Sequence, residues 1–223
     1  MKLQALVFDA YGTLFDVHSV GARCEQFWPG KGAALSQVWR TKQLEYSWQR
    51  TLMDRYVPFS TVTRDALAYA CEALGLALSA GQSDALMQAY LALAPYPDVP
   101  GALERLRAGG RKLAILTNGS PDMIAPLVAH CGMDKTFDAV LSADAVTRFK
   151  VAPQVYQHAV ERLGVAAGAI GFVSSNCWDA LAAKNFGFSV WWINRQNAPV
   201  DRLDARPDGI LKSLGELPER LPA

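Results

Sequence analysis

"LQALVFDAYGTLFD" occupies residues 3–16 and decides how the rest of the chain is interpreted. A short apolar run ends abruptly at Asp9, and a turn containing Gly12 follows. An apolar run of this length, bounded by turn residues, is typical of a strand buried on both faces. We therefore expect a buried strand that carries a carboxylate at its carboxyl end. Tyr11, two residues further on, is the second feature that needs an explanation.

Three further apolar runs have the same form: "KLAILT" (112–117), "AIGFVS" (169–174) and "SVWWIN" (189–194). Helical patterns lie between the runs, over residues 102–110, 123–132, 154–164 and 179–187. Three of these helices end at Gly110, Gly164 or Gly187, where a left-handed residue would let the chain turn back into a strand. The alternation predicts an α/β fold with a Rossmann-like, doubly wound parallel sheet.

Residues 16–96 break this pattern, because they contain no convincing strand. Helices are expected there over residues 31–53, 63–75 and 83–94, and the proline-rich "PYPDVPG" (95–101) returns the chain to the sheet. We predict an α/β core domain formed by residues 1–15 and 97–223, and a helical cap domain formed by residues 16–96. The cap should cover the carboxyl edge of the sheet, where open α/β sheets bind ligands.

Net charge, cysteine spacing and the length of the apolar runs limit the partners and the compartment that we expect. The 223 residues carry a net charge of +1, which gives no reason to expect nucleic acid or an anionic membrane. The four cysteines are scattered, so neither a zinc site nor a disulfide framework is indicated, and reduced thiols are expected. No apolar run is long enough for a signal-peptide core or a membrane span. A cytoplasmic protein is the expectation.

Polar residues follow three of the predicted strands, and a lysine lies in one of the loops. Asp9 alone reads most simply as the cap of a turn. However, Thr117 and Asn118 end the second strand, and Lys150 lies in "RFKVAPQVY" (148–156). The segment "FVSSNCWD" (172–179) then supplies Ser174, Ser175, Asn176 and Asp179. Because the carboxyl ends of parallel strands meet at one edge, these side chains should converge into one site.

The ordered set of Asp, Thr, Lys and a final acidic loop, with the cap insertion, resembles the haloacid dehalogenase superfamily over the whole chain. Most members of that superfamily are magnesium-dependent phosphatases, with a second Asp two residues after the nucleophile and further acids in the last motif. Here Tyr11 takes the place of the second Asp, and Asp179 is the single acid of the last motif. Oxygen ligands for Mg²⁺ are therefore few, and a general acid for an alkoxide leaving group is missing.

A halide leaves without a proton, so the sequence resembles the metal-independent L-2-haloacid dehalogenase branch. The resemblance implies that Asp9 attacks C2 of a short (S)-2-haloalkanoic acid and forms an ester on its own carboxylate. Water then hydrolyses the ester, releasing the (R)-2-hydroxy acid. Lys150 is the partner expected to keep Asp9 charged. The branch commonly has Pro after this Lys, whereas this chain has Val151.

The same resemblance assigns the remaining site residues. Arg40, Asn118 and Trp178 match the halide-binding set, and Tyr11, Leu44, Phe59 and Trp178 match the apolar wall around the substrate. Thr117 and nearby backbone amides are expected to hold the substrate carboxylate. Asn176, Asp179 and Ser174 match residues that position water, while Thr13 and Tyr156 match supporting positions. Ser175 could share or replace the role of Ser174, and the sequence leaves that open.

The resemblance further implies no metal or other cofactor, a small-molecule 2-haloacid as the partner, and a homodimer. Two other readings stay open from the sequence. One is a magnesium-dependent phosphatase of the same superfamily, because Asp9 and Lys150 are shared with that class. The other is a catalytically idle binding protein on the same fold. Every catalytic position of the family holds a chemically competent residue here, which argues against that reading. Preferred chain length and halogen are not given by the sequence.

Overall fold

A computed structural model describes residues 2–221, and the structural statements below concern these residues. Their core is a single parallel sheet with the strand order β3-β2-β1-β4-β5-β6. The strands are β1 (Ala5–Phe8), β2 (Lys112–Thr117), β3 (Ala139–Ser142), β4 (Ile170–Ser174), β5 (Ser189–Ile193) and β6 (Gly209–Leu211). The first strand is central, so a residue that follows it lies in the middle of the sheet's edge.

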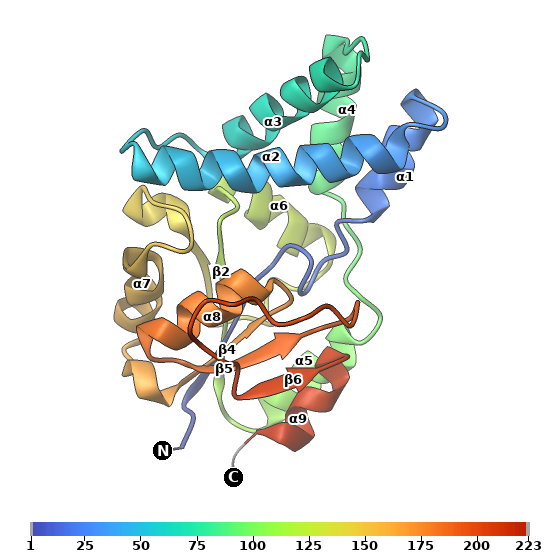
Figure 1. Cartoon of the computed structure of the whole chain (residues 1–223). Helices are drawn as coiled ribbons and strands as arrows, with labels where there is room; N and C mark the ends of the chain where they lie inside the picture. The colour runs from blue at the N-terminus through green and yellow to red at the C-terminus, as the bar shows by residue number, and fades with distance from the viewer. Residues whose placement is uncertain (1, 222–223) are drawn as a thin grey trace.

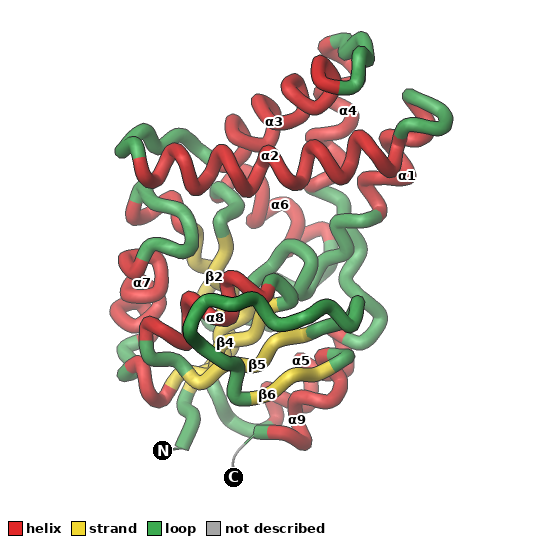
Figure 2. The backbone as a smooth tube through the Cα atoms, viewed as in Figure 1, coloured by secondary structure: helices red, strands yellow, loops and turns green. Residues whose placement is uncertain are grey.

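Helices cover the sheet on both faces, as Figures 1 and 2 show. They are α5 (Val99–Ala108), α6 (Pro121–His130), α7 (Pro153–Leu163), α8 (Cys177–Phe186) and α9 (Leu217–Arg220), with short 3₁₀ turns η1 (Ala143–Val146), η2 (Ala167–Ala169) and η3 (Leu214–Glu216). The strand order reverses direction after β3. Because parallel crossovers are right-handed, this order puts α5 and α6 on one face and α7 and α8 on the other.

Four helices lie together over the carboxyl end of the sheet (Figure 1). They are α1 (Ser19–Phe27), α2 (Gly32–Leu52), α3 (Phe59–Ala73) and α4 (Ala80–Tyr90), all inserted between β1 and α5. The two connecting segments run side by side, since Asp16 N donates to Ala94 O and Tyr96 N to Leu14 O, both at 2.9 Å. The long helix α2 thereby lies across the edge at which β1 ends.

The insertion also contacts the core at the far end of α2. The Tyr56 hydroxyl donates to Asp144 Oδ1 at 2.6 Å, and Phe149 N donates to Thr51 Oγ1 at 3.0 Å. The loop that carries Lys150 is therefore held directly by the insertion. Two polar contacts next to a functional loop restrict how far α2 can move away from it.

The predicted α/β class and doubly wound parallel sheet are confirmed, but the sequence pattern missed the helices α1 and α9 and the strands β3 and β6. The two missed strands are the edges of the sheet and are only three or four residues long. Each exposes an apolar residue, Val140 being 41% and Ile210 49% exposed. Short, half-solvated edge strands give no continuous apolar run, which is why the sequence pattern did not reveal them.

Helix ends agree with the expectation at two of three glycines. Gly164 and Gly187 are left-handed residues directly after α7 and α8, with φ of 62° and 116°. Gly110 is also left-handed, with φ of 73°, but α5 ends earlier, at Ala108. Pro126 lies inside α6.

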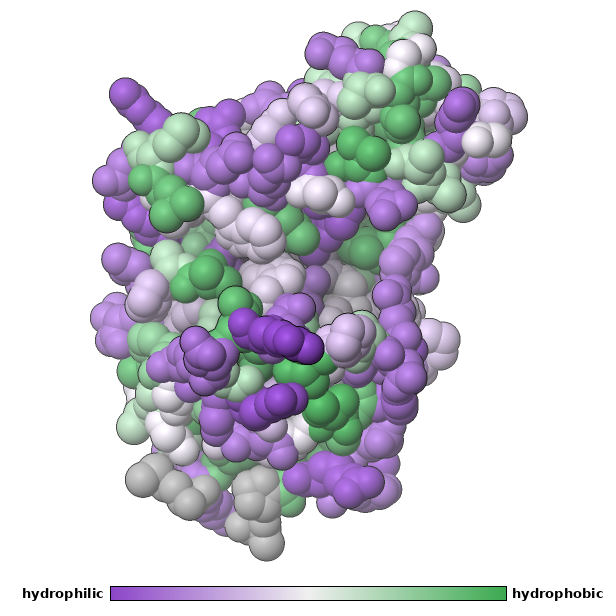
Figure 3. All heavy atoms as spheres, in the orientation of Figure 1, coloured by the Kyte–Doolittle hydropathy of each residue, from purple (hydrophilic) through white to green (hydrophobic). Residues whose placement is uncertain are grey.

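The surface mixes polar and apolar residues. On the face drawn in Figure 3, hydrophilic side chains cover both the insertion and the core, with apolar residues in small groups between them. Within residues 2–221, no helix combines the length and the apolar character required to cross a membrane.

Candidate active site

Asp9 lies directly after β1 and is only 6% exposed. Its two carboxylate oxygens have different surroundings. Oδ2 accepts hydrogen bonds from Thr13 Oγ1 at 2.9 Å, Asn176 Nδ2 at 2.9 Å and Ser174 Oγ at 3.4 Å. Oδ1 accepts from Lys150 Nζ at 3.0 Å. Three donors therefore fix one oxygen, while the other keeps lone pairs available for a reaction.

Lys150 bridges two carboxylates from within the protein. Its Nζ lies 3.0 Å from Asp9 Oδ1 and 2.8 Å from Asp179 Oδ2, and the side chain is 1% exposed. Burial would lower the pKa of Lys150, but Asp179 and Asp9 outweigh that effect and raise it above its ordinary value. Asn118 Oδ1 accepts from the Lys150 backbone N–H at 2.8 Å and fixes the same loop. The lysine is thus a permanent buried cation.

Asp179 is fully buried in the first turn of α8. Burial raises its pKa, Lys150 lowers it and Asp9 raises it, with a result of about 6. The Tyr156 hydroxyl donates to Asp179 Oδ1 at 2.8 Å, and the pKa of Tyr156 lies well above its ordinary value because of burial and the neighbouring Asp179. A carboxylate with a pKa of about 6 can accept a proton near neutral pH.

The two serines of the last motif lie in different places. The Ser174 hydroxyl lies between the carboxylates, 3.4 Å from Asp9 Oδ2 and 3.1 Å from Asp179 Oδ2. Ser175 faces Thr13 instead: its backbone N–H donates to Thr13 Oγ1 at 2.8 Å, and its Oγ lies 3.1 Å from the same atom. Ser174 is therefore in contact with both acids, and Ser175 holds the threonine that contacts Asp9.

A cavity at Asp9 is lined by ten residues from the core and the insertion. They are Asp9, Tyr11, Arg40, Leu44, Phe59, Thr117, Asn118, Lys150, Asn176 and Trp178, all of them predicted site residues. Its volume of about 10 Å³ corresponds to roughly one water molecule. The predicted Thr13, Tyr156, Ser174 and Asp179 lie behind it as the polar network described above, and Ser175 lines a neighbouring cavity. The structure brings all the predicted side chains to one place.

Aromatic side chains hold the wall of this cavity in place. Tyr11 packs edge-on against Tyr90, with ring centroids 6.1 Å apart, and Trp178 against Trp48 at 5.4 Å. A Cβ at Gly119 would lie 2.7 Å from Tyr11 Cε2, so glycine is required there. Burial raises the pKa of Tyr11, which keeps its hydroxyl protonated. Tyr11 therefore contributes an aromatic surface where a second acid would otherwise stand.

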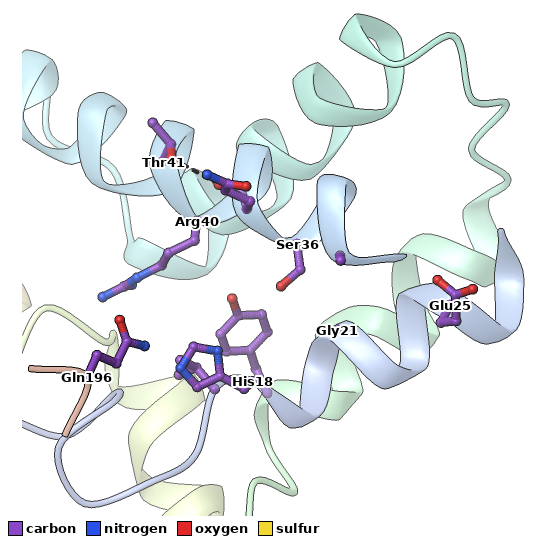
Figure 4. Close-up of a pocket in the computed structure, with 11 residues that line it drawn as sticks. His18, Gly21, Glu25, Ser36, Arg40, Thr41 and Gln196 are labelled. Carbon is purple, nitrogen blue, oxygen red and sulfur yellow. Dashed lines mark hydrogen bonds between the residues drawn. The ribbon is translucent and has the colours of Figure 1, made fainter. Parts of the chain in front are cut away.

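Two larger cavities adjoin the small one. One, of about 370 Å³, shares Tyr11, Arg40 and Asn176 with it, and the other, of about 690 Å³, lies between α1 and α2. Arg40 lines all three. Figure 4 shows its side chain extending from α2 toward Gln196, with His18 nearby. Arg40 thus lines both the small cavity at Asp9 and the two larger cavities beside it.

Sequence reasoning missed Gln43, whose side chain accepts a hydrogen bond from Arg40 Nη1 at 2.6 Å. Its helix buries Leu35, Trp39 and Gln43, each four residues apart. That spacing marks one helix face. A glutamine on this buried face needs a hydrogen-bonding partner, and this signal could have identified it.

The surroundings of Asp9 do not fit the magnesium site of a phosphatase. Over residues 2–221, no three or more His, Cys, Asp or Glu side chains are grouped closely enough to hold a metal ion. Asp9 and Asp179 are the two carboxylates at the site, and both are paired with Lys150. Mg²⁺ prefers several oxygen ligands in octahedral geometry, which this set of side chains does not supply.

An aspartate directly after a central strand of a parallel sheet, paired with a buried lysine beneath a helical insertion, is the arrangement that this α/β fold presents. The chain belongs to the haloacid dehalogenase-like hydrolase family, whose model matches residues 3–187.

Within this family the chain is similar to dehalogenases. It is 49% identical to an (S)-2-haloacid dehalogenase of Pseudomonas putida, covering 97% of this chain and 95% of that protein. It is 44% identical to haloacetate dehalogenase H-2 of Moraxella sp. (strain B), covering 93% and 92%. A solved L-2-haloacid dehalogenase of Xanthobacter autotrophicus, with chloropropionic acid covalently bound, has a TM-score of 0.90, 44% identity and 97% coverage of both chains.

Replacing Lys150 tests the buried charge arrangement. In Lys150→Met, Asp9 and Asp179 lose their shared cation inside the protein, so the free energy of unfolding at pH 7 should fall by about 3–5 kcal/mol. The loss should shrink at pH 5, because the unpaired carboxylates can then take up protons. Urea denaturation at both pH values measures the change.

The matched control is Lys184→Met, which breaks the partly exposed pair of Lys184 with Asp208. That variant should lose less than about 1 kcal/mol. Equal losses for the two variants, or a Lys150→Met loss that is the same at both pH values, would contradict the assigned role of the buried pair.

Proposed function

We propose that the protein is a hydrolytic dehalogenase that converts short (S)-2-haloalkanoic acids into (R)-2-hydroxyalkanoic acids and halide, without a metal. The observation that carries the proposal is the unequal environment of the Asp9 carboxylate. Oδ2 is held by three donors and Oδ1 accepts from Lys150, and Asp9 lines a small cavity together with apolar side chains, Arg40 and Asn118. The names of the relatives, which are (S)-2-haloacid dehalogenases and a haloacetate dehalogenase, support the same substrate class.

In the first step, Asp9 Oδ1 attacks C2 of the substrate. A C–O bond forms, the C–halogen bond breaks, and the bonding electrons leave with the halide. Because the attack is in line with the leaving group, C2 is inverted. Arg40, the Asn118 amide and Trp178 lie around the same cavity as Asp9, and they would face the negative charge that develops on the halogen. Asn118 uses its oxygen on Lys150 N, so its NH₂ group is the end left for an anion.

In the second step, water attacks Cγ of the Asp9 ester. The negative charge then develops on Oδ2, which already faces the Thr13 hydroxyl and the Asn176 amide, each at 2.9 Å. Donors in place before the reaction stabilise such an oxyanion strongly. The Cγ–Oδ1 bond breaks, and Lys150 Nζ, 3.0 Å from Oδ1 and 2.8 Å from Asp179 Oδ2, donates a proton to the departing alkoxide and recovers the proton that Asp179 took from water. The new carboxylic acid of Asp9 then loses its proton to solvent. Different side chains thus contact the reacting atoms of Asp9 in ester formation and in ester hydrolysis.

Asp179 is the base that we assign to the attacking water. It lies in contact with Ser174 at 3.1 Å, and Tyr156 holds its other oxygen. Its pKa of about 6 leaves it ionised at neutral pH but still basic enough to accept a proton. Thr117 would hold the substrate carboxylate together with backbone amides, its own hydroxyl accepting from Gly119 N at 3.0 Å.

The phosphatase reading is weaker. Tyr11 cannot protonate an alkoxide leaving group from a phosphate ester, since burial holds its proton. The similarity to a structure with covalently bound chloropropionic acid favours carbon–halogen chemistry. An idle binding protein would not need two acids, a lysine and a hydroxyl arranged around one carboxylate. Chain length and halogen preference stay open within the proposed class.

The assay that separates these readings uses purified protein with (S)-2-chloropropionate in excess EDTA. Chloride release should proceed undiminished by EDTA, and a generic phosphate ester with Mg²⁺ should give no phosphate. Asp9→Asn should fold normally, as judged by circular dichroism, and release no chloride, because the amide is not a nucleophile.

Metal-dependent phosphate release without chloride release would overturn the proposal in favour of a phosphatase. No turnover of chloro-, bromo- or haloacetate substrates by a folded protein would favour the idle scaffold. Chloride release by Asp9→Asn equal to that of the unaltered chain would remove Asp9 from the mechanism.

The pH dependence tests Asp179. Since its carboxylate must be ionised to accept the water proton and its pKa is raised to about 6, kcat should be constant above that pH. At lower pH, kcat should fall about tenfold per pH unit once Asp179 becomes protonated in the ester, where the charge of Asp9 no longer raises its pKa. Steady-state rates between pH 4.5 and 8, in buffers of constant ionic strength, measure the profile. A kcat that stays constant down to pH 4.5 would contradict the role of Asp179 as a base.

We also propose that residues 16–96 act as a separate cap domain over a core of residues 1–15 and 97–223, and that the protein works as a homodimer in the cytoplasm. The clustering of α1–α4 supports the first proposal, and the free thiols of all four cysteines support a reducing compartment. The dimer rests on the family resemblance. Light scattering after size-exclusion chromatography would give a mass of one chain if it is wrong.

A further inference from the structure

We propose that Gln43 is a positioning residue for halide departure, because it orients the guanidinium of Arg40 while leaving its charge free. This inference rests on the proposed function and extends it to a residue outside the cavity lining. Gln43 is fully buried on α2, one turn from Arg40, and its Oε1 accepts from Arg40 Nη1 at 2.6 Å. This hydrogen bond fixes the Nη1 edge of the Arg40 guanidinium against Gln43 within the insertion.

The orientation of the Gln43 amide is imposed by helix α3. The Thr63 hydroxyl donates its single proton to Phe59 O at 2.7 Å, a hydrogen bond within that helix. Thr63 Oγ1 can then only accept from its other neighbour, and Gln43 Nε2 donates to it at 2.8 Å. With its NH₂ group committed to Thr63, the amide must present its oxygen to Arg40. The hydrogen bonds therefore have one consistent direction from Arg40 to the backbone of Phe59.

This series of hydrogen bonds connects two walls of the cavity at Asp9. Arg40 on α2 and Phe59 at the start of α3 both line it, and Thr63 is held further by Trp39 Nε1, which donates to Thr63 O at 2.8 Å. Tyr90 lies against the same groups: burial raises the pKa of its hydroxyl to about 12, while Arg40 and Gln43 act to lower it. Gln43 and Thr63 are both buried and hydrogen-bonded to each other, so their side chains have few alternative arrangements.

The neutrality of glutamine matters for the function. A carboxylate partner would form an ion pair with Arg40 and cancel the charge that a leaving halide needs. Its second oxygen would also face the lone pair of Thr63. An apolar residue would leave Arg40 without an anchor. The amide fixes the direction of the guanidinium and keeps its full positive charge for the anion.

The test compares chloride and bromide as leaving groups. Chloride is the poorer leaving group and depends more on stabilisation by Arg40, so Gln43→Leu should lower kcat for 2-chloropropionate by roughly 10- to 100-fold, and for 2-bromopropionate by less. Gln43→Glu should show the same halogen-dependent loss. Thr63→Val should show the same halogen-dependent loss of kcat as Gln43→Leu, but a smaller one. Thr63→Ser keeps the hydroxyl, so its ratio of kcat for 2-chloropropionate to kcat for 2-bromopropionate should equal that of the unaltered protein.

The matched control is Gln49→Leu, an exposed glutamine on the same helix whose amide contacts Glu45 at 3.1 Å, and it should leave both rates unchanged. The role of Gln43 would be overturned if Gln43→Leu lost no kcat or lost it equally with both halogens. It would also be overturned if Thr63→Ser had the same ratio of chloride to bromide rates as Thr63→Val. In each case the proposed dehalogenase activity would stand. If the unaltered protein releases neither halide, the proposed function fails, and this inference fails with it.

Discussion

The ammonium group of Lys150, buried between Asp9 and Asp179, is the interaction on which the rest of the site depends. Two carboxylates could not both stay charged at this depth without a cation within hydrogen-bond distance. The sheet makes the arrangement possible, since β1 ends at Asp9 and β4, beside it, leads to Asp179. The lysine comes from the loop before α7, and the insertion holds that loop through Thr51.

The same interaction makes the two oxygens of Asp9 unequal. Lys150 takes Oδ1, and Thr13, Asn176 and Ser174 take Oδ2. A nucleophile needs one oxygen free to attack, and an ester under hydrolysis needs donors at the other. A single fixed carboxylate therefore suits both halves of a double displacement without any rearrangement of its partners. Tyr11 completes the arrangement by adding an apolar surface instead of a proton donor.

Sequence reasoning predicted the parallel sheet and the polar residues at its edge, because Asp9, Thr117, Asn118 and the segment 174–179 follow continuous apolar runs. The remaining site residues were predicted from the family resemblance. It could not predict the edge strands β3 and β6, whose few residues are half exposed. The division of work between Ser174 and Ser175 also escaped it, since both follow the same strand and only the path of the turn separates them. Helical spacing marks Gln43 as an inward-facing residue, but its partner Thr63 depends on the packing of α2 against α3, which a linear pattern does not give.

A single turnover of (S)-2-chloropropionate in H₂¹⁸O, with enzyme in excess, shows whether Asp9 itself becomes the ester. Since water attacks Cγ of Asp9 and the product keeps the original Oδ1, mass spectrometry should find ¹⁸O in the peptide containing Asp9 and none in the hydroxyl group of the product. Label in that hydroxyl group after the first turnover, with an unlabelled Asp9 peptide, would mean that water attacks C2 directly and would contradict the account.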